Sequence, residues 1–413
     1  MRFFSSFLLV FSAFFLISCS AGKGKTAILW ADRPEFAFYA GYFNAAQNQY
    51  KVETHYYDFP AQKLRENGSY PDIVAGSWLK SVSTRVFFKP LDGHFWGNSL
   101  HRSDFYPKLL AMGNIEGKQY LLPVSFNATM VVFARDNAGE LSSPFTLGFD
   151  EMKKQGKEYN TETRGAYTRM GFSPTWDDNF LFTTAALFNT SFREADPIAW
   201  DSLALDRAMR FAYEWTGEAN TNIQAVDDFT FKYLYNPLPT LALSGRILFT
   251  CMDSDRFFTL AEDQQNNLDF RWLAENNTIP LAEESVYLGL AKKGKAPKAA
   301  AAFLRWFFNA ETQRSLLETS RQNRILETSF GISGGFSAMR PVTEQIFPQF
   351  YLGLLGHMPP AELLSPPNIL PVNWMSLKER VILPYLHDRA RQSDQEGIYQ
   401  LERRLADWQR LNR

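Results

Sequence analysis

Cysteine, histidine and excess charge of either sign are all scarce in this chain of 413 residues. It contains two cysteines and five histidines, and no two histidines stand at a metal-ligand spacing. Lys and Arg number 43 against 44 Asp and Glu, so the formal net charge is −1. Nothing in this balance favours nucleic acid as a partner. No internal repeat or low-complexity segment is visible, and we expect neither a metal nor another cofactor.

Apolar and aromatic residues are abundant instead. Hydrophobic residues make up 45% of the chain and charged residues 21%, which is typical of a globular protein. A length of 413 residues favours two domains over one, because single cores rarely grow beyond about 250–300 residues. The 10 Trp and 37 Phe exceed what a core strictly needs, so some of them could face a ligand.

The one long apolar run lies at the N-terminus. It extends from Phe3 to Ile17 behind a single basic residue, Arg2, and 15 residues are short for a bilayer core of about 30 Å. The run ends in Leu-Ile-Ser-Cys, which resembles the bacterial lipobox, with a small Ser18 and the thiol of Cys19 as acylation nucleophile. We therefore predict a signal peptide at 1–18, a lipidated Cys19 that anchors the protein to a membrane at the periplasmic or exterior side, and a tether at 19–25. Cys251 is then left without a disulfide partner, and we expect it to be buried.

The mature chain opens with an alternation of strands and helices. Strand-like runs are predicted at Thr26–Trp30, Lys51–Tyr57 and Pro71–Trp78, and helical spacing at Phe36–Asn48. This βαβ progression predicts a parallel sheet, and ligands bind beyond the carboxyl ends of such strands. Asp32 and Glu35 follow the first strand and Trp78 ends the third, so all three are candidate ligand contacts at one edge. A core position is the alternative for Trp78.

The stretch Gly117–Arg135 is a candidate connection between two structural units. Two apolar runs flank Pro123 and enclose the polar patch Ser125-Phe126-Asn127. An edge hairpin is the alternative, but the α/β patterns before and after the stretch favour a chain that crosses between units. In that arrangement Ser125 and Asn127 would form the polar floor of a cleft, and the strand near Ser285–Leu290 is the candidate return.

Two acidic groups in the second half are further candidates. Trp176-Asp177-Asp178 precedes the apolar helix 181–188, and Asp253 follows a strand that ends at Met252. An aromatic ring beside paired carboxylates can hold sugar hydroxyls, or a cation through charge and cation–π attraction. The alternative is a helix N-cap, where Asp is favoured for backbone reasons.

Several short motifs occur in an order that resembles one protein family. They are Pro71-Asp72-Ile73-Val74, Lys89-Pro90-Leu91-Asp92, Gly117–Ser125, Phe145–Glu151, Ala296–Phe307 and Asn309–Gln313. With the lipobox, this series resembles the sugar-binding ABC-transporter solute-binding proteins, extracellular solute-binding protein family 1, over roughly residues 16–320. One departure is the segment Thr278–Glu284, which replaces a glycine-rich loop of the family. It leaves open whether Glu283 and Glu284 contact the ligand.

The resemblance implies a periplasmic-binding-protein type II-like α/β fold, with two lobes joined by crossing hinge strands and a cleft between them. We assign 26–124 with 280–330 to the first lobe and 125–279 with 331–413 to the second. The implied function is capture of a sugar or oligosaccharide by a monomer and its delivery to ABC permease subunits, without catalysis.

Two alternatives stay open. The same fold could bind a polyamine or another cation through Asp177, Asp178 and Asp253 with Trp176 stacked on it. A lipoprotein glycoside hydrolase could use Asp177 and Asp178, although adjacent carboxylates rarely straddle one scissile bond. The segment Gly331–Gly335 matches G-x-S-x-G, but without a strand-to-helix elbow a glycine loop is the better interpretation.

Overall fold

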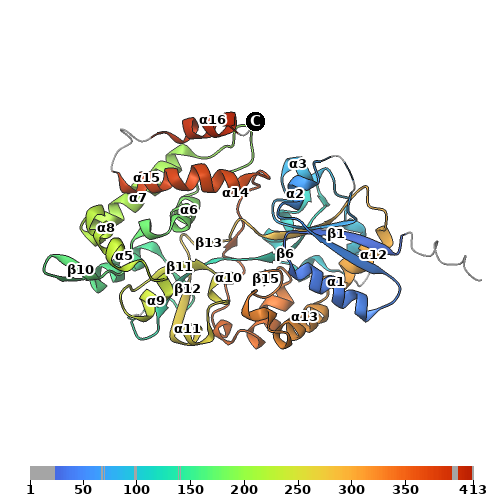
Figure 1. The fold of residues 1–413 in the computed structure, drawn as a ribbon, viewed down its shortest axis with the longest axis horizontal. Helices are drawn as coiled ribbons and strands as arrows, with labels where there is room; N and C mark the ends of the chain where they lie inside the picture. The colour runs from blue at the N-terminus through green and yellow to red at the C-terminus, as the bar shows by residue number, and fades with distance from the viewer. Residues whose placement is uncertain are drawn as a thin grey trace, which may run out of the picture.

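Two α/β lobes lie side by side in the computed structural model (Figure 1). It describes residues 24–66, 68, 70–96, 100–137, 139, 141–392 and 399–411. The predicted signal peptide, Cys19 and the tether up to residue 23 lie outside the described residues.

The first lobe is built on a six-stranded sheet in the order β15-β6-β14-β3-β1-β2. Strands β1, β2 and β3 are parallel, as the βαβ pattern predicts, whereas β14 and β15 run antiparallel to their neighbours. Strands β3, β6 and β14 consist of buried residues throughout, because helices and loops cover both faces of the sheet. The strands are β1 (Thr26–Ala31), β2 (Lys51–Tyr56), β3 (Ile73–Gly76), β6 (Leu122–Phe126), β14 (Val286–Leu290) and β15 (Phe336–Ser337). The helices are α1 (Glu35–Ala46), α2 (Pro60–Lys63), α3 (Val82–Arg85), α4 (Pro107–Ala111), α12 (Pro297–Phe307) and α13 (Ala310–Gln322).

The second lobe has a four-stranded sheet in the order β11-β7-β12-β8. Strand β7 is buried along its whole length and pairs antiparallel with β11 and β12. The strands are β7 (Thr129–Ala134), β8 (Thr146–Leu147), β11 (Thr250–Asp253) and β12 (Leu268–Leu273). The helices are α5 (Phe149–Tyr159), α6 (Asp178–Leu187), α7 (Ser202–Asn220), α8 (Ile223–Tyr233), α9 (Leu238–Leu243), α10 (Ser254–Phe257) and α11 (Glu262–Asn267). Two small hairpins lie outside the main sheets: β4 (Asn114–Ile115) with β5 (Lys118–Gln119), and β9 (Thr161–Thr163) with β10 (Ala166–Arg169).

Segments that connect the two sheets run through the centre of the molecule. The chain passes from β6 to β7 at Asn127-Ala128, which confirms that the 117–135 stretch is a crossing and not an edge hairpin. The return passes through β13 (Ile279–Pro280) to β14, where the Ala282 N–H donates to the Asn127 carbonyl at 2.8 Å. A later segment returns to the second lobe through β16 (Leu364–Ser365), which pairs with β13. These adjacent connections form the hinge region.

The C-terminal part forms a layer of helices over the second lobe (Figure 1). It comprises α14 (Trp374–Leu377), the π-helical turn η8 (Lys378–Ile382), α15 (Leu383–Arg391) and α16 (Leu401–Leu411). Trp374 is fully buried in a cluster that also contains Trp30 and Trp78 of the first lobe, so one continuous core joins the two lobes. At the rim, Ser81 and the Val82 N–H of the first lobe donate to the Glu194 carboxylate of the second, at 2.6 and 2.7 Å.

The expected lobe boundaries need a correction. Ser125 and Phe126 belong to β6 of the first sheet, and β15, at 336–337, also belongs to that sheet. The predicted assignment of everything from residue 331 onward to the second lobe is therefore wrong for β15. This strand is too short to carry a period-2 signal, which is why sequence reasoning missed it.

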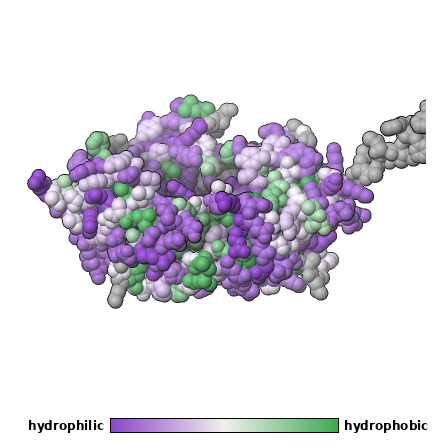
Figure 2. All heavy atoms as spheres, turned by 60° about the horizontal axis from the view of Figure 1, so that its bottom comes forward, coloured by the Kyte–Doolittle hydropathy of each residue, from purple (hydrophilic) through white to green (hydrophobic). Residues whose placement is uncertain are grey.

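The face at the bottom of Figure 1 is predominantly hydrophilic, with hydrophobic residues in small separate patches (Figure 2). Among the described residues, no helix combines the length and apolar character needed to cross a membrane.

Candidate functional site

A cavity of about 790 Å³ lies between the lobes at the hinge region. Its wall includes the β6–β7 junction, residues along the whole of α6, the β11–α10 corner, the 278–286 crossing, the loop 328–334 and parts of the C-terminal layer. Small-molecule sites in proteins occupy roughly 300–1,000 Å³. The cavity therefore has the size and the position expected for a solute held between two lobes.

The floor of the cavity is a polar network at the hinge. Ser125 Oγ donates to the Ser333 carbonyl at 3.2 Å, and Asn127 Nδ2 donates to the Gly334 carbonyl at 2.8 Å. Ser254 Oγ donates to Asn127 Oδ1 at 2.7 Å, so one amide connects the crossing strand with α10 and with the 331–335 loop. Gly335 is required there because a Cβ atom would lie 2.7 Å from the Phe126 carbonyl oxygen. The segment is a glycine loop, as interpreted from the sequence.

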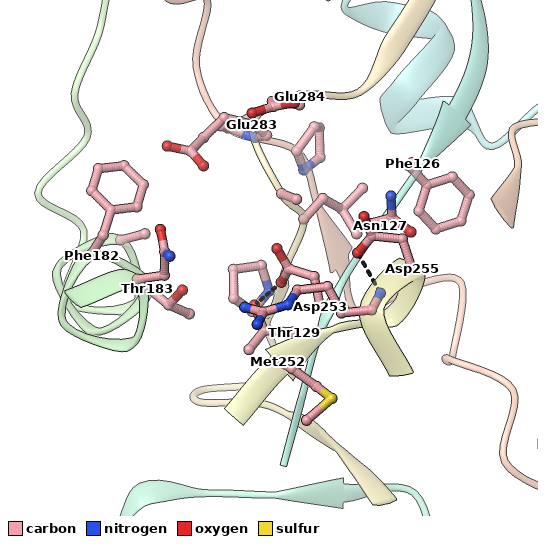
Figure 3. Close-up of a pocket in the computed structure, with 18 of the residues that line it drawn as sticks. Phe126, Asn127, Thr129, Phe182, Thr183, Met252, Asp253, Asp255, Glu283 and Glu284 are labelled. Atoms are coloured by element: carbon pink, nitrogen blue, oxygen red, sulfur yellow. Dashed lines mark hydrogen bonds between the residues drawn. The ribbon is translucent and has the colours of Figure 1, made fainter. Parts of the chain in front are cut away.

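Carboxylates dominate the second-lobe wall. Asp253 ends β11 and accepts a hydrogen bond from Thr129 Oγ1 at 2.9 Å. Burial is the main cause that raises the pKa of Asp253 to about 6, and the nearby Asp255 and Glu283 carboxylates contribute to this rise, while the Thr129 hydrogen bond and Lys378 oppose it. Burial also raises the pKa of Asp177 and of Asp255. Figure 3 shows the Asp253 carboxylate facing the open space of the cavity.

The wall between the C-terminal layer and the 278–286 crossing contains a buried ion pair. Lys378 Nζ of η8 lies 2.9 Å from Glu283 Oε2 on the crossing segment, and both side chains are about nine-tenths buried. Trp374 Nε1 donates to the other Glu283 oxygen at 3.0 Å, and Lys378 Nζ also lies 4.3 Å from the centre of the Phe182 ring. The pair fixes the C-terminal layer to the hinge and places a cation at the cavity wall. Figure 3 shows Glu283 and the Phe182 ring at this wall.

The first-lobe wall carries Arg33 and Glu35. Arg33 forms an ion pair with Glu284 at 3.3 Å, and Glu35 Oε1 accepts a hydrogen bond from the Ser329 hydroxyl. The second oxygen of Glu35, Oε2, is buried without a hydrogen-bond partner. Ser333 Oγ is also buried without a hydrogen-bond partner, in a residue that is 1% exposed. These two atoms are acceptor positions that the protein itself leaves unused.

Five of the nine candidate contacts from the sequence line this cavity. They are Glu35, Ser125, Asn127, Asp177 and Asp253. Glu283 and Glu284, about which the sequence left the question open, also belong to the lining. Their contact with a ligand stays a prediction.

The other four candidates lie outside the lining, and their expected position needs correction. Trp78 is 7% exposed and packs in the shared core. Trp176 stacks on Phe229 at 5.7 Å, and Asp178 lies 2.9 Å from His387 Nδ1. Asp32 is turned toward β3 and accepts from the Ser77 N–H at 2.7 Å. Packing holds Trp78 and Trp176, a side-chain contact with His387 holds Asp178, and a backbone hydrogen bond holds Asp32. A core position for Trp78 was the alternative interpretation of the sequence.

Several lining residues escaped sequence reasoning. Asp255 and Arg256 stand beside Asp253, so adjacency to a candidate was an available signal. Phe182 and Lys378 gave no such signal, because Phe182 looks like an ordinary apolar helix position and the C-terminal part carries no recognised motif. Cys251 is buried, as expected, and lies in the wall.

Asp253→Asn should stabilise the unliganded protein at neutral pH. The folded-state pKa of about 6 is above the ordinary value, so the carboxylate lowers stability progressively as the pH rises from about 4 to about 6. Asparagine keeps an acceptor for Thr129 and carries no charge. We expect a higher Tm for the variant at pH 7 and no gain near pH 4, measured by thermal unfolding across this range. An equal Tm difference at both pH values would contradict the argument.

No group of three or more His, Cys, Asp or Glu side chains within the described ranges is arranged to hold a metal ion. A second, smaller cavity of about 240 Å³ lies beside the first and shares Leu187 and Asn189 with it.

Comparison with solved structures identifies the fold. The sugar-binding protein MalE from the phytopathogen Xanthomonas citri is 12% identical with a TM-score of 0.68, over 94% of this chain and 96% of that chain. The cyclic α-maltosyl-1,6-maltose binding protein from Arthrobacter globiformis is 17% identical with a TM-score of 0.61, over 92% and 96%. An ABC substrate-binding protein from Listeria monocytogenes in complex with cycloalternan is 14% identical with a TM-score of 0.60, over 92% and 96%. These similarities confirm the periplasmic-binding-protein type II fold.

Sequence comparison gives the family. No curated protein matches the chain. The family model of the bacterial extracellular solute-binding proteins matches residues 39–323, which is more than half of the chain. The protein therefore belongs to the bacterial extracellular solute-binding protein family.

Proposed function

We propose that the protein captures an oligosaccharide between its lobes and delivers it to an ABC importer. The observation that carries this proposal is the hinge-region cavity of about 790 Å³, whose wall combines phenylalanine rings with many hydrogen-bonding groups. Sugar rings offer C–H faces for the rings and hydroxyls for the polar groups.

Similar structures support the choice of ligand class. The related fold in other proteins holds maltotetraose, mannotriose and cycloalternan, each in a protein that is 13–16% identical to this one. Lipidation at Cys19 would retain such a receptor at the membrane beside its permease, as the lipobox predicts.

The arrangement of the acids supports binding without catalysis. Asp177 caps α6 and faces the cavity, whereas Asp178 begins the helix and lies against His387. Two carboxylates that flank one glycosidic bond must both face it, at about 5–5.5 Å or 6.5–9.5 Å from each other. This pair does not meet the requirement, so hydrolysis is the weaker proposal.

The test is the identity of the ligand and its effect on stability. Protein purified from its native host should release an oligosaccharide that mass spectrometry identifies. Adding that sugar back at 100 times its Kd should raise the free energy of unfolding by about 2.7 kcal/mol. Release of a non-carbohydrate solute, or hydrolysis of the added sugar, would overturn the proposal.

A further inference from the structure

The cavity wall carries a surplus of negative charge. Seven carboxylates line it, against three cationic side chains, and no histidine is among its lining residues. The carboxylates belong to Glu35, Asp177, Asp253, Asp255, Glu283, Glu284 and Glu379, and the cations to Arg33, Arg256 and Lys378.

Ion pairing inside the protein removes only part of this surplus. Glu283 is paired with Lys378 and Glu284 with Arg33. The other five lining carboxylates form no ion pair with any described residue, and Arg256 is the lining cation left to oppose them. Closing the lobes over a neutral solute would leave these charges without counterions in a site that excludes water.

We propose that the solute is a saccharide that carries at least one protonated amino group, received by Asp253 and its neighbouring carboxylates. This inference rests on the proposed function and specifies its substrate class. An ammonium group supplies three hydrogen-bond donors and a positive charge, which would offset the surplus of carboxylates. Sugar hydroxyls of the same ligand can contact the polar lining residues Glu35, Ser125 and Asn127.

Asp253 is the centre of the proposed cation site. It stands at the corner between β11 and α10, and Asp255 and Glu283 are close enough to raise its pKa. Lys378 lowers that pKa but is itself engaged by Glu283. A ligand ammonium would relieve the repulsion among these groups, so binding should favour the ionised form of Asp253.

The charge of the ligand can be read from the material that the native-host protein releases. A saccharide with a free amine supports the proposal. A neutral or acidic saccharide overturns it and leaves the proposed function intact, whereas release of a polyamine or another non-carbohydrate overturns both.

Calorimetry with the released saccharide, before and after N-acetylation, then tests whether Asp253 binds the amino group. Acetylation removes the charge and keeps the sugar framework, so it should weaken binding about tenfold or more, in line with hydrogen bonds to charged groups. Asp253→Asn should weaken binding of the amine form by a similar factor and change binding of the acetylated form little. Because the same variant should fold with a higher Tm at pH 7, loss of affinity cannot be attributed to unfolding.

The matched control is Asp263→Asn on the exposed surface of α11, which removes one negative charge outside the cavity. We expect it to leave both affinities unchanged. Equal weakening of the amine and acetylated forms by Asp253→Asn, or a stronger effect of Asp263→Asn, would overturn the assignment of the cation site.

Discussion

Glu283→Gln should lower the free energy of unfolding by about 3 kcal/mol. Removing one partner of a buried ion pair leaves the other charge uncompensated, at a cost of about 3–5 kcal/mol. Lys378 would lose the carboxylate 2.9 Å away and keep its contact with the Phe182 ring. Because the ion pair lies at the wall of a cavity that water can enter, we expect a cost at the lower end of this range. Glutamine keeps an oxygen for the Trp374 indole, so the change reports on the charge.

A double-mutant cycle isolates this pair. Lys378→Met alone should also destabilise, because it leaves the Glu283 carboxylate buried without a cation. The double variant should recover most of the loss, since neither charge then remains. Urea unfolding of the four proteins gives the coupling energy, and Glu327→Gln, on an exposed side chain, serves as the control. A coupling energy below about 1 kcal/mol would show that the pair behaves like a surface ion pair.

The parts of the fold that could be predicted are those that local sequence patterns determine. The alternation of Lys51–Tyr57 predicted strand β2 to within one residue. The apolar run at Pro71–Trp78 located β3, although the strand itself covers only Ile73–Gly76. Pro123 and the polar patch after it marked the crossing, because a change from apolar to polar within a strand is visible without any distant contact. Family motifs then fixed the order of the lobes.

Only part of the candidate site could be predicted from the sequence, for a physical reason. Asp177 and Asp178 are neighbours in the sequence, but at a helix start the N-cap and the first helical residue point in different directions. One carboxylate therefore reaches the cavity and the other does not. The pair of Glu283 and Lys378 joins positions 95 residues apart, and no local pattern encodes such a contact. The short strand β15 gave no periodic signal either, so its place in the first sheet could not be foreseen.

Trp272→Ala should lower the free energy of unfolding by about 4 kcal/mol. Truncation of a buried Trp costs roughly 3–5 kcal/mol through lost burial and the cavity left behind. Trp272 is 0% exposed in β12, and its ring lies 5.4 Å from Phe270 and 5.9 Å from Phe336. Its indole N–H donates to the His357 carbonyl at 2.9 Å, so alanine would also remove that carbonyl's donor.

The position of Trp272 makes this change informative about the hinge. Phe336 belongs to the first sheet and Trp272 to the second, so their contact joins the lobes on the side of the crossing segments. Trp272→Phe should keep part of this packing and lose the hydrogen bond. Its free energy of unfolding should therefore lie between those of the wild type and of Trp272→Ala. Trp96→Ala, at a residue that is 81% exposed, should change stability by less than about 0.5 kcal/mol. The contrary result would be the same urea midpoint for Trp272→Ala and Trp96→Ala. Aromatic packing between the sheets would then not be what holds the lobes together at the hinge. The hydrogen bonds of Asn127 with Gly334 and Ser254 would have to do so instead.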